Sequence, residues 1–230
     1  MNSPDSTNRD GFSIDLTGIG ESASAALINS LSLIPRDTSR GGIRHLLNVP
    51  VIAALASHPS IRKPIEAMLG PGVFAFKATY FEKSPGSNWF VGWHQDDMIP
   101  VAKKLDVLGF SRWSEKSGVT HAQPPSEILE RIVAVRVNLD PSTSENGALD
   151  VLPGSHRNGL LSEDGIAKFV ESTPRVPCLT PAGGLIFMRP LLLHASSRMT
   201  VPSSRRVIHF EFAADALPGG LDWHTRVALT

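Results

Sequence analysis

The chain has 230 residues, which is enough for one domain with a substantial core and too few for two comfortable ones. Its 22 basic residues balance 22 acidic ones, so electrostatics gives no reason to expect nucleic acid or a membrane surface as a partner. The single cysteine, Cys178, excludes an intrachain disulfide and favours a reducing compartment. No apolar run approaches the roughly 20 residues of a membrane span. The polar N-terminus also lacks a secretory signal, so we expect a cytoplasmic protein.

Helical patterns dominate the first third of the chain. Residues 1–12 are rich in Ser, Asp and Asn and are predicted to be disordered, while residues 13–230 are predicted to form a single domain. The apolar pattern predicts helices that begin near residue 25 and stop before Pro35, then at 50–56 and at 60–69.

After Gly72, short runs of strand-forming residues alternate with turn sequences. One further helix is predicted near 162–171. Helices followed by many short strands favour a mainly β protein, a cupin-like jelly-roll barrel with helices on its outside. The predicted strands lie at 73–83, 89–95, 131–140, 148–152, 176–179, 184–188 and 205–213.

The connection at 97–125 has no strong periodicity. A connection of this length in a compact domain is usually a lid, a binding loop or a disordered segment. We expect a lid or substrate loop, with poor order as an equal alternative. Trp113 and His121 are candidate substrate contacts within it, although core packing or disorder would account for either residue.

A histidine and an aspartate two positions apart end the strand predicted at 89–95. Positions i and i+2 of a strand point to the same side, so His94 and Asp96 share one face. Two imidazoles and one carboxylate on one face form the ligand set of iron(II) that activates oxygen. Eight histidines and 22 acidic residues predict ~0.8 His-x-acid pairs by chance, so the pattern alone is weak.

The third ligand must come from a distant strand. His194 lies 98 residues after Asp96, at the end of the apolar stretch 184–193, where a satisfied core histidine is the alternative explanation. A second His-x-acid pair, His209-Phe210-Glu211, lacks a good partner, because only His224 follows it.

An arginine in the last predicted strand is suited to the distal carboxylate of 2-oxoglutarate, because a guanidinium pairs a carboxylate with two hydrogen bonds. Alternation places the apolar residues at 208, 210 and 212 on one face with Arg206, and Arg205 on the other. If the apolar face packs against the helices, Arg205 points into the barrel. In strand 131–140, Arg136 and Asn138 likewise share the face opposite the valines. A site would supply partners for both, and an exposed sheet face explains them equally well.

Together these pieces resemble the phytanoyl-CoA dioxygenase family of iron(II)/2-oxoglutarate oxygenases. The resemblance runs from about Val73 to Trp223. Arg205 lies eleven residues after His194, where the family has its cosubstrate arginine. The motifs are Phe81-Glu82-Lys83-Ser84-Pro85, Trp93-His94-Gln95-Asp96, Asn146-Gly147-Ala148-Leu149, Leu152-Pro153-Gly154-Ser155-His156 and Leu193-His194-Ala195-Ser196.

The resemblance implies a double-stranded β-helix with Fe(II) held by His94, Asp96 and His194. It further implies 2-oxoglutarate bound by Arg205 and Ser196, with Arg136 as another side chain that faces this cosubstrate. We also take Gln95 and Asn138 as candidate substrate contacts. The presence of Asp96 argues against the related halogenases, which have a small residue in place of the carboxylate.

The expected function is oxidation of an unactivated C–H bond of a small organic molecule by O2, with release of succinate and CO2. Hydroxylation is the default outcome, and desaturation, epimerisation or cyclisation uses the same metal chemistry. Two alternatives remain open: a catalytically silent jelly-roll binding protein, and a cupin-like metal-dependent hydrolase or isomerase. The sequence indicates neither the substrate nor the oligomeric state.

Overall fold

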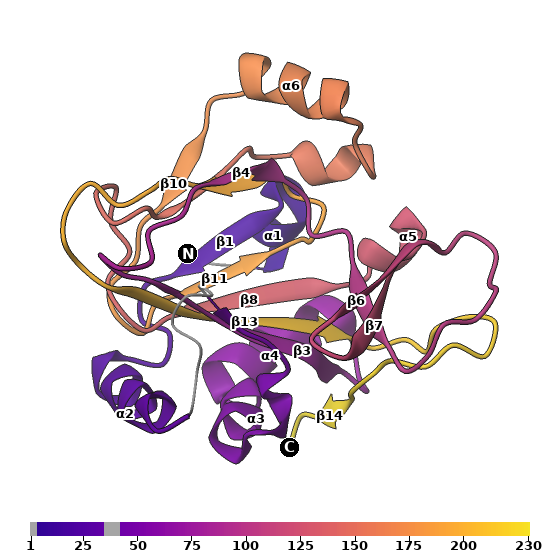
Figure 1. Ribbon diagram of the computed structural model, residues 1–230, viewed down its shortest axis with the longest axis horizontal. Helices are drawn as coiled ribbons and strands as arrows, with labels where there is room; N and C mark the ends of the chain where they lie inside the picture. The colour runs from indigo at the N-terminus through magenta and orange to yellow at the C-terminus, as the bar shows by residue number, and fades with distance from the viewer. Residues whose placement is uncertain (1–3, 35–41) are drawn as a thin grey trace.

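Two β-sheets face each other across the molecule, and helices cover the outer side of the larger sheet (Figure 1). This computed structural model describes residues 4–34 and 42–230. Within these ranges, neighbouring strands of the larger sheet pair antiparallel in the order β1 (Phe12–Asp15), β11 (Leu185–Met188), β8 (Val133–Asn138), β13 (Arg205–Ala213), β3 (Phe74–Lys83) and β14 (Val227–Ala228), with β2 (Gly42–Ile43) paired to β3.

The remaining strands of the described residues form two smaller antiparallel sheets. The sheet that faces the large one has the order β10 (Val176–Cys178), β9 (Leu149–Val151), β12 (His194–Ser196) and β4 (Val91–His94). A three-stranded sheet has the order β5 (Ile99–Val101), β7 (Val119–Gln123) and β6 (Ser111–Lys116). The mainly β class is confirmed. The described strands form two facing sheets, as in a jelly roll, and do not close into one barrel.

Helices α1 to α4 lie in the first third of the chain. No helix in the described ranges is long and apolar enough to cross a membrane. The helices predicted at 50–56, 60–69 and 162–171 are confirmed to within one residue. The helices are α1 (Pro4–Asp10), α2 (Glu21–Ser32), α3 (Pro50–Ala56), α4 (Pro59–Leu69), α5 (Ser126–Leu129) and α6 (Glu163–Ser172), with 3-10 turns η1 (Leu46–Asn48) and η2 (Ser155–Asn158).

The core fixes which face of the large sheet can form a site. Ile208, Phe210 and Phe212 of β13 are fully buried in one cluster with apolar residues of α2, α3 and α4. Burial of each such side chain stabilises the fold by roughly 1.5–3 kcal/mol. The predicted parity is therefore confirmed: the alternate residues of β13, including Arg205, point inward between the two sheets.

The N-terminus differs from its prediction. Residues 4–10 form α1 in place of the predicted disorder, and residues 1–3 lie outside the described ranges. Thr7 is fully buried and its hydroxyl is 2.7 Å from the Ser13 hydroxyl. The Asn8 side chain accepts a hydrogen bond from Arg189 at 2.5 Å. These tertiary contacts hold a segment whose polar composition predicted disorder.

The segment 97–125 also differs from a plain loop, because it contains the β5-β7-β6 sheet and leads into α5. Two local features hide the period of β6. A bulge between Ser111 and Ser114 shifts its register, and Arg112 has a positive φ of 47°. Most of β6 is also exposed, so it lacks the apolar alternation of a half-buried strand.

Candidate active site

A cavity of about 150 Å³ lies between the two facing sheets. Strands β3, β8 and β13 of the large sheet form one wall, and residues from β4, β9 and β12 or next to them form the other. The lining residues are Lys77, Thr79, Phe81, Lys83, Trp89, Val91, His94, Asp96, Arg136, Leu149, His194, Ala195, Ser196, Arg205 and His209.

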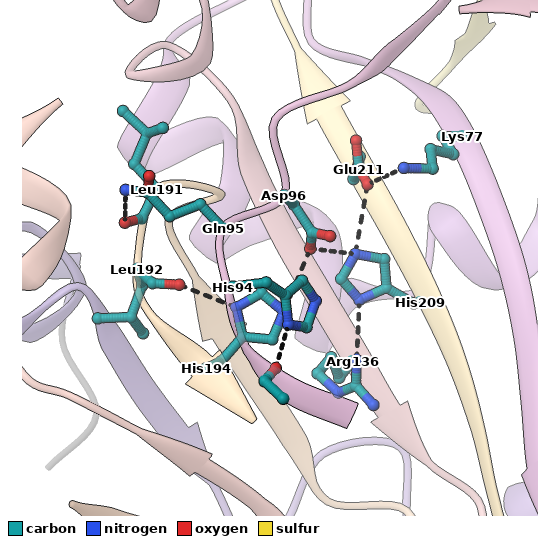
Figure 2. Close-up of polar contacts among 11 residues, drawn as sticks. Lys77, His94, Gln95, Asp96, Arg136, Leu191, Leu192, His194, His209 and Glu211 are labelled. Carbon is teal, nitrogen blue, oxygen red and sulfur yellow. Dashed lines mark hydrogen bonds and ion pairs between the residues drawn. The ribbon is translucent and has the colours of Figure 1, made fainter. Parts of the chain in front are cut away.

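His94, Asp96 and His194 converge at this cavity (Figure 2). His94 and His194 are register partners in the antiparallel pair β4–β12, with their ring centroids 4.1 Å apart. The Asp96 N–H donates to Pro190 O at 2.9 Å, which anchors the backbone just beyond β4. One ligand atom from each of the three side chains lies within 4.8 Å of the others. The structure thus brings the three predicted residues together, and two neutral nitrogen donors with one carboxylate suit iron(II).

The orientation of the two imidazoles suits a metal. Nδ1 of His94 is 2.8 Å from Gly92 O, and Nδ1 of His194 is 2.8 Å from Leu192 O. Because a carbonyl oxygen only accepts, each Nδ1 carries the proton and each Nε2 keeps a lone pair for a metal. Burial and the neighbouring His94 lower the pKa of His194 to about 3, which keeps it in the neutral form that binds metals.

The electrostatics of Asp96 also fits ligation. Burial alone would raise the pKa of Asp96, but His194, His209 and Lys77 more than offset it and hold this pKa well below its usual range. The carboxylate is therefore ionised across the physiological range, as a metal ligand must be.

A second group of possible ligands shares Asp96. His209 Nε2 is 3.6 Å from Asp96 Oδ2 and 3.4 Å from Glu211 Oε1. The Arg136 guanidinium lies 3.3 Å from His209 Nδ1, and since arginine only donates, the His209 proton is on Nε2. Lys77 already pairs with Glu211 at 2.6 Å. This group is therefore arranged as a hydrogen-bonded chain of charges beside Asp96 and not as a metal site.

The sequence analysis missed this chain of charges. It set aside the pair His209 and Glu211 because no suitable histidine follows it in the sequence. The partner is instead Asp96, which precedes the pair by more than a hundred residues and meets it across the cavity. The parity that selected Arg205 also places His209 and Glu211 on the inner face of β13, and this signal could have identified them.

Two buried guanidinium groups of the cavity have nitrogens without hydrogen-bond partners among the described residues. Arg205 is 4% exposed, and its Nε and Nη1 have no hydrogen-bond partner among the described residues, nor does Nε of the buried Arg136. Burial is the main cause of the lowered pKa of each arginine. Buried guanidinium nitrogens without partners are costly, and the carboxylate of a bound ligand would satisfy them.

Two other predicted cosubstrate or substrate residues lie near these cations. Ser196 lines the cavity beside Arg205, whose Nη2 donates to the Ser196 hydroxyl at 3.1 Å. Asn138 is buried beneath the cavity and does not line it; its amide lies 3.4 Å from Gly184 O.

Gln95 points away from the side chains of His94 and Asp96 and does not line the cavity (Figure 2). Its amide nitrogen donates to Gly159 O at 2.9 Å and to Leu191 O at 2.7 Å, while its oxygen accepts from the Leu161 N–H at 2.9 Å. The expected substrate contact is therefore corrected: successive strand residues face opposite sides, and the Gln95 amide holds backbone groups behind the metal ligands.

Trp113 lies in β6 and His121 in β7 of the three-stranded sheet, and neither lines the cavity. Trp113 stacks on Phe110, with ring centroids 6.4 Å apart, against an apolar cluster. His121 is 3% exposed and donates from Nδ1 to Val119 O at 3.0 Å. The packing alternative therefore accounts for both residues in this structure.

Comparison with known proteins agrees with the site. A sequence model of the phytanoyl-CoA dioxygenase (PhyH) family matches residues 34–207, about three quarters of the chain. The chain belongs to this family. The resemblance that rested on short motifs is thus confirmed over most of the fold.

Related proteins match over part of the chain at low identity. The peroxisomal phytanoyl-CoA dioxygenase of Homo sapiens is 26% identical over 169 residues, which cover 68% of this chain and 44% of that protein. The L-proline trans-4-hydroxylase of Streptomyces griseoviridis is 27% identical over 186 residues, or 69% of this chain and 61% of that protein. The chain thus spans less than half the length of the human protein.

Solved structures share the fold. EctD from S. alaskensis with 2-oxoglutarate and 5-hydroxyectoine superposes with a TM-score of 0.70 at 20% identity, over 92% of this chain and 74% of that chain. The 2-oxoglutarate-dependent epimerase SnoN from nogalamycin biosynthesis gives a TM-score of 0.65 at 19% identity, over 99% and 93%. The predicted jelly-roll fold is confirmed by these likenesses.

Proposed function

We propose that this chain is an Fe(II)- and 2-oxoglutarate-dependent oxygenase that oxidises a C–H bond of a small organic molecule. The observation that carries the proposal is one cavity with two complementary ends. One end has two imidazole Nε2 atoms and a carboxylate within 4.8 Å of one another, and the other has buried guanidinium nitrogens without partners. A metal fits the first end and a ligand with a free carboxylate fits the second.

Each group of cavity residues has its own role in the proposed reaction. His94, Asp96 and His194 hold Fe(II), and the carbonyl groups that fix both imidazoles keep Nε2 directed at it. Arg205 pairs with the distal carboxylate of 2-oxoglutarate and so orients this cosubstrate, with Arg136 beside it. The enclosing sheets limit the access of water. When bound, Fe(II) and 2-oxoglutarate supply oxygen activation coupled to release of succinate and CO2.

The substrate is proposed by class alone. The relatives and fold neighbours include a proline hydroxylase, a carbocyclase and an epimerase. We therefore propose a small molecule with an unactivated C–H bond, and hydroxylation as the default reaction. A cytoplasmic location and the absence of a nucleic-acid or membrane partner stay predictions.

The first test is an anaerobic titration of the metal-free protein with Fe(II) and then 2-oxoglutarate. We expect the weak visible charge-transfer band of the chelated complex in the wild type and its loss in Asp96→Ala and His194→Ala. Asp97→Ala is the matched control, because its carboxylate is bound to Arg112 and Gln123 outside the cavity and the band should persist. A wild type that binds Fe(II) but gives no band would refute the proposal.

The two alternative functions give different results. A catalytically silent binding protein would form the band but release no succinate with any substrate across a broad panel. A hydrolase or isomerase would turn over with zinc under anaerobic conditions. Substrate-dependent succinate formation that is lost in Asp96→Ala would exclude both.

A further inference from the structure

The strand β13 sets an order of residues along the cavity. Its inner face carries Arg205, His209 and Glu211 in that order. His209 lies beside the metal ligand Asp96, and Glu211 pairs with Lys77 at 2.6 Å (Figure 2). Glu211 follows Arg205 by six residues, which is roughly 20 Å along a strand. Because the cosubstrate occupies the side of Arg205, a substrate must reach the metal from the side of Glu211 and Lys77.

The edge of β3 is open beside Lys77. Along this edge β2 pairs with residues 80–81 and β14 pairs with residues 74–75, so the residues between them have no strand partner on that side in the described structure. A small cavity of about 100 Å³ lies at this gap and is lined by its residues together with His45 and His224. Lys77 lines both this cavity and the larger one, so the two cavities meet at its side chain.

Three histidines from distant parts of the chain gather at this opening. The ring centroid of His45 lies 5.7 Å from that of His224 and 6.2 Å from that of His121. His45 Nε2 donates to Lys116 O in β6 at 3.4 Å, and the His224 N–H donates to Pro100 O in β5 at 3.2 Å. Burial is the main cause that lowers the pKa of His45 and of His121, so both rings are mostly neutral at pH 7. The charge at the opening therefore comes from lysine and arginine side chains.

Arg44 and Lys116 carry this charge on either side of His45. Arg44 precedes His45 in the chain, and the Lys116 carbonyl accepts the hydrogen bond from the His45 ring. Neither cationic side chain forms a salt bridge or hydrogen bond with another residue that the structure describes. Burial, Lys77 and Arg44 lower the pKa of Lys116, so these three cations lie close enough to repel one another.

The carboxylates that interact with these cations already have other partners. Glu211 pairs with Lys77, and Asp97 pairs with Arg112. Asp96 belongs to the group of three candidate metal ligands. The two remaining cations of the opening therefore lack a counter-charge of their own. The anionic group of a bound molecule would supply it, and its oxygens would accept hydrogen bonds from the free ammonium and guanidinium groups.

We propose that the substrate carries an anionic oxygen group, a carboxylate or a phosphate, which Arg44 and Lys116 bind at this opening. Lys77 gives one proton to Glu211 and has two further protons for the same group. The rest of the substrate extends past Lys77 toward Asp96, so that its reactive C–H bond lies beside the metal. This inference rests on the proposed function and deepens it, because it names the substrate class: a small organic acid or phosphate ester.

The test measures the binding of three probes to the anaerobic protein loaded with Fe(II) and 2-oxoglutarate. The probes are phenylacetate, phenyl phosphate and the neutral phenylacetamide, and the broadening of their aromatic NMR signals gives the dissociation constants. We expect at least one anion to bind roughly tenfold more tightly than the amide, as hydrogen bonds to charged groups allow. Arg44→Met and Lys116→Met should each weaken anion binding roughly 3- to 10-fold and leave amide binding unchanged. Lys168→Met, at an exposed position of α6, is the matched control and should behave like the wild type.

The outcomes distinguish this proposal from the proposed function. A wild type that gives no charge-transfer band with Fe(II) and 2-oxoglutarate overturns the proposed function. A wild type that gives the band but binds the amide as tightly as both anions overturns the anionic substrate alone. An anion affinity that neither Arg44→Met nor Lys116→Met changes does the same.

The position of the probe is tested in the same samples. The charge-transfer band should persist when an anion is added, because the anion binds at the opening and leaves 2-oxoglutarate in place. Loss of the band would show that the probe displaces the cosubstrate from Arg205 and would overturn the assignment of the opening. The stronger of the two anions identifies the group as a carboxylate or a phosphate. The preference of the wild type for anions needs no variant, so a misfolded variant does not block the test.

Discussion

At the scale of single residues, Gln95 shows how a side chain between two metal ligands can serve the fold. Its amide makes three hydrogen bonds to backbone groups at Gly159, Leu161 and Leu191. We expect Gln95→Ala to lower the free energy of unfolding by about 2–4 kcal/mol, since each bond contributes roughly 0.5–1.5 kcal/mol. Urea unfolding measures this loss. A substrate-binding role would instead leave stability unchanged and raise the KM.

The same scale shows what sequence reasoning can reach. The common face of His94 and Asp96 and the inward direction of Arg205 could be predicted, because spacing and alternation within one strand determine which side chains share a face. The burial of Lys83 opposite Arg205 could not be predicted, because it depends on the register of β3 against β13, and register is set by tertiary packing. A lysine at the end of a strand pattern reads as a solvated side chain until its cross-strand partner is known.

At the scale of elements, α1 provides the clearest disagreement with the sequence. Its helix is short and polar, yet it is tied to the rest of the fold: Asn8 O accepts from His156 Nε2 at 3.1 Å, and Arg9 O accepts from Arg157. Deletion of residues 1–10 should therefore cost roughly 2–5 kcal/mol, the sum of a buried threonine and several hydrogen bonds. Asp5→Ala, at an exposed position of the same helix, is the control. Thermal unfolding of the deletion variant at the wild-type temperature would support the predicted disorder.

The elements of the large sheet were easier to predict than those of 97–125. Strands β3, β8 and β13 are each covered by helices on one face. Their apolar residues therefore tend to recur at every second position, which is the pattern that predicts a strand. The strand β6 has no such cover, and its bulge and positive φ at Arg112 break the period that remains. The three-stranded sheet is therefore specified by tertiary contacts and not by a local pattern.

At the scale of the whole molecule, the formal net charge is zero, but the buried charged side chains are unevenly distributed. The described structure buries Lys83 and Arg205 as cross-strand partners on the inner face of the large sheet, while Asp96 and Glu211 lie on either side of His209, which also contacts Arg136. Net charge bears on partners and solubility and says nothing of such separation. The order of helices and strands did predict the fold class, because a layer of helices can cover only the outer face of a jelly-roll sheet.

The buried histidines predict how the stability of the whole metal-free protein depends on pH. Burial is the main cause that lowers the pKa of His121 to about 4 and that of His194 to about 3, against about 6.5 in an unfolded chain. Between pH 6.5 and 4 the unfolded state binds protons that the folded state does not, so stability falls as the pH falls through this window.

The size of this effect can be measured with one variant. His121 alone should contribute about 2–3 kcal/mol of the loss, since it is nearly fully buried and its folded pKa lies well below 6.5. Urea unfolding at pH 7 and pH 4.5 should show a smaller loss in His121→Asn, which keeps a donor for Val119 O, than in the wild type. Because His121 lies outside the cavity lining, the variant should bind Fe(II) and 2-oxoglutarate as the wild type does at pH 7. An equal loss of stability in both proteins would show that His121 takes up its proton in the folded state.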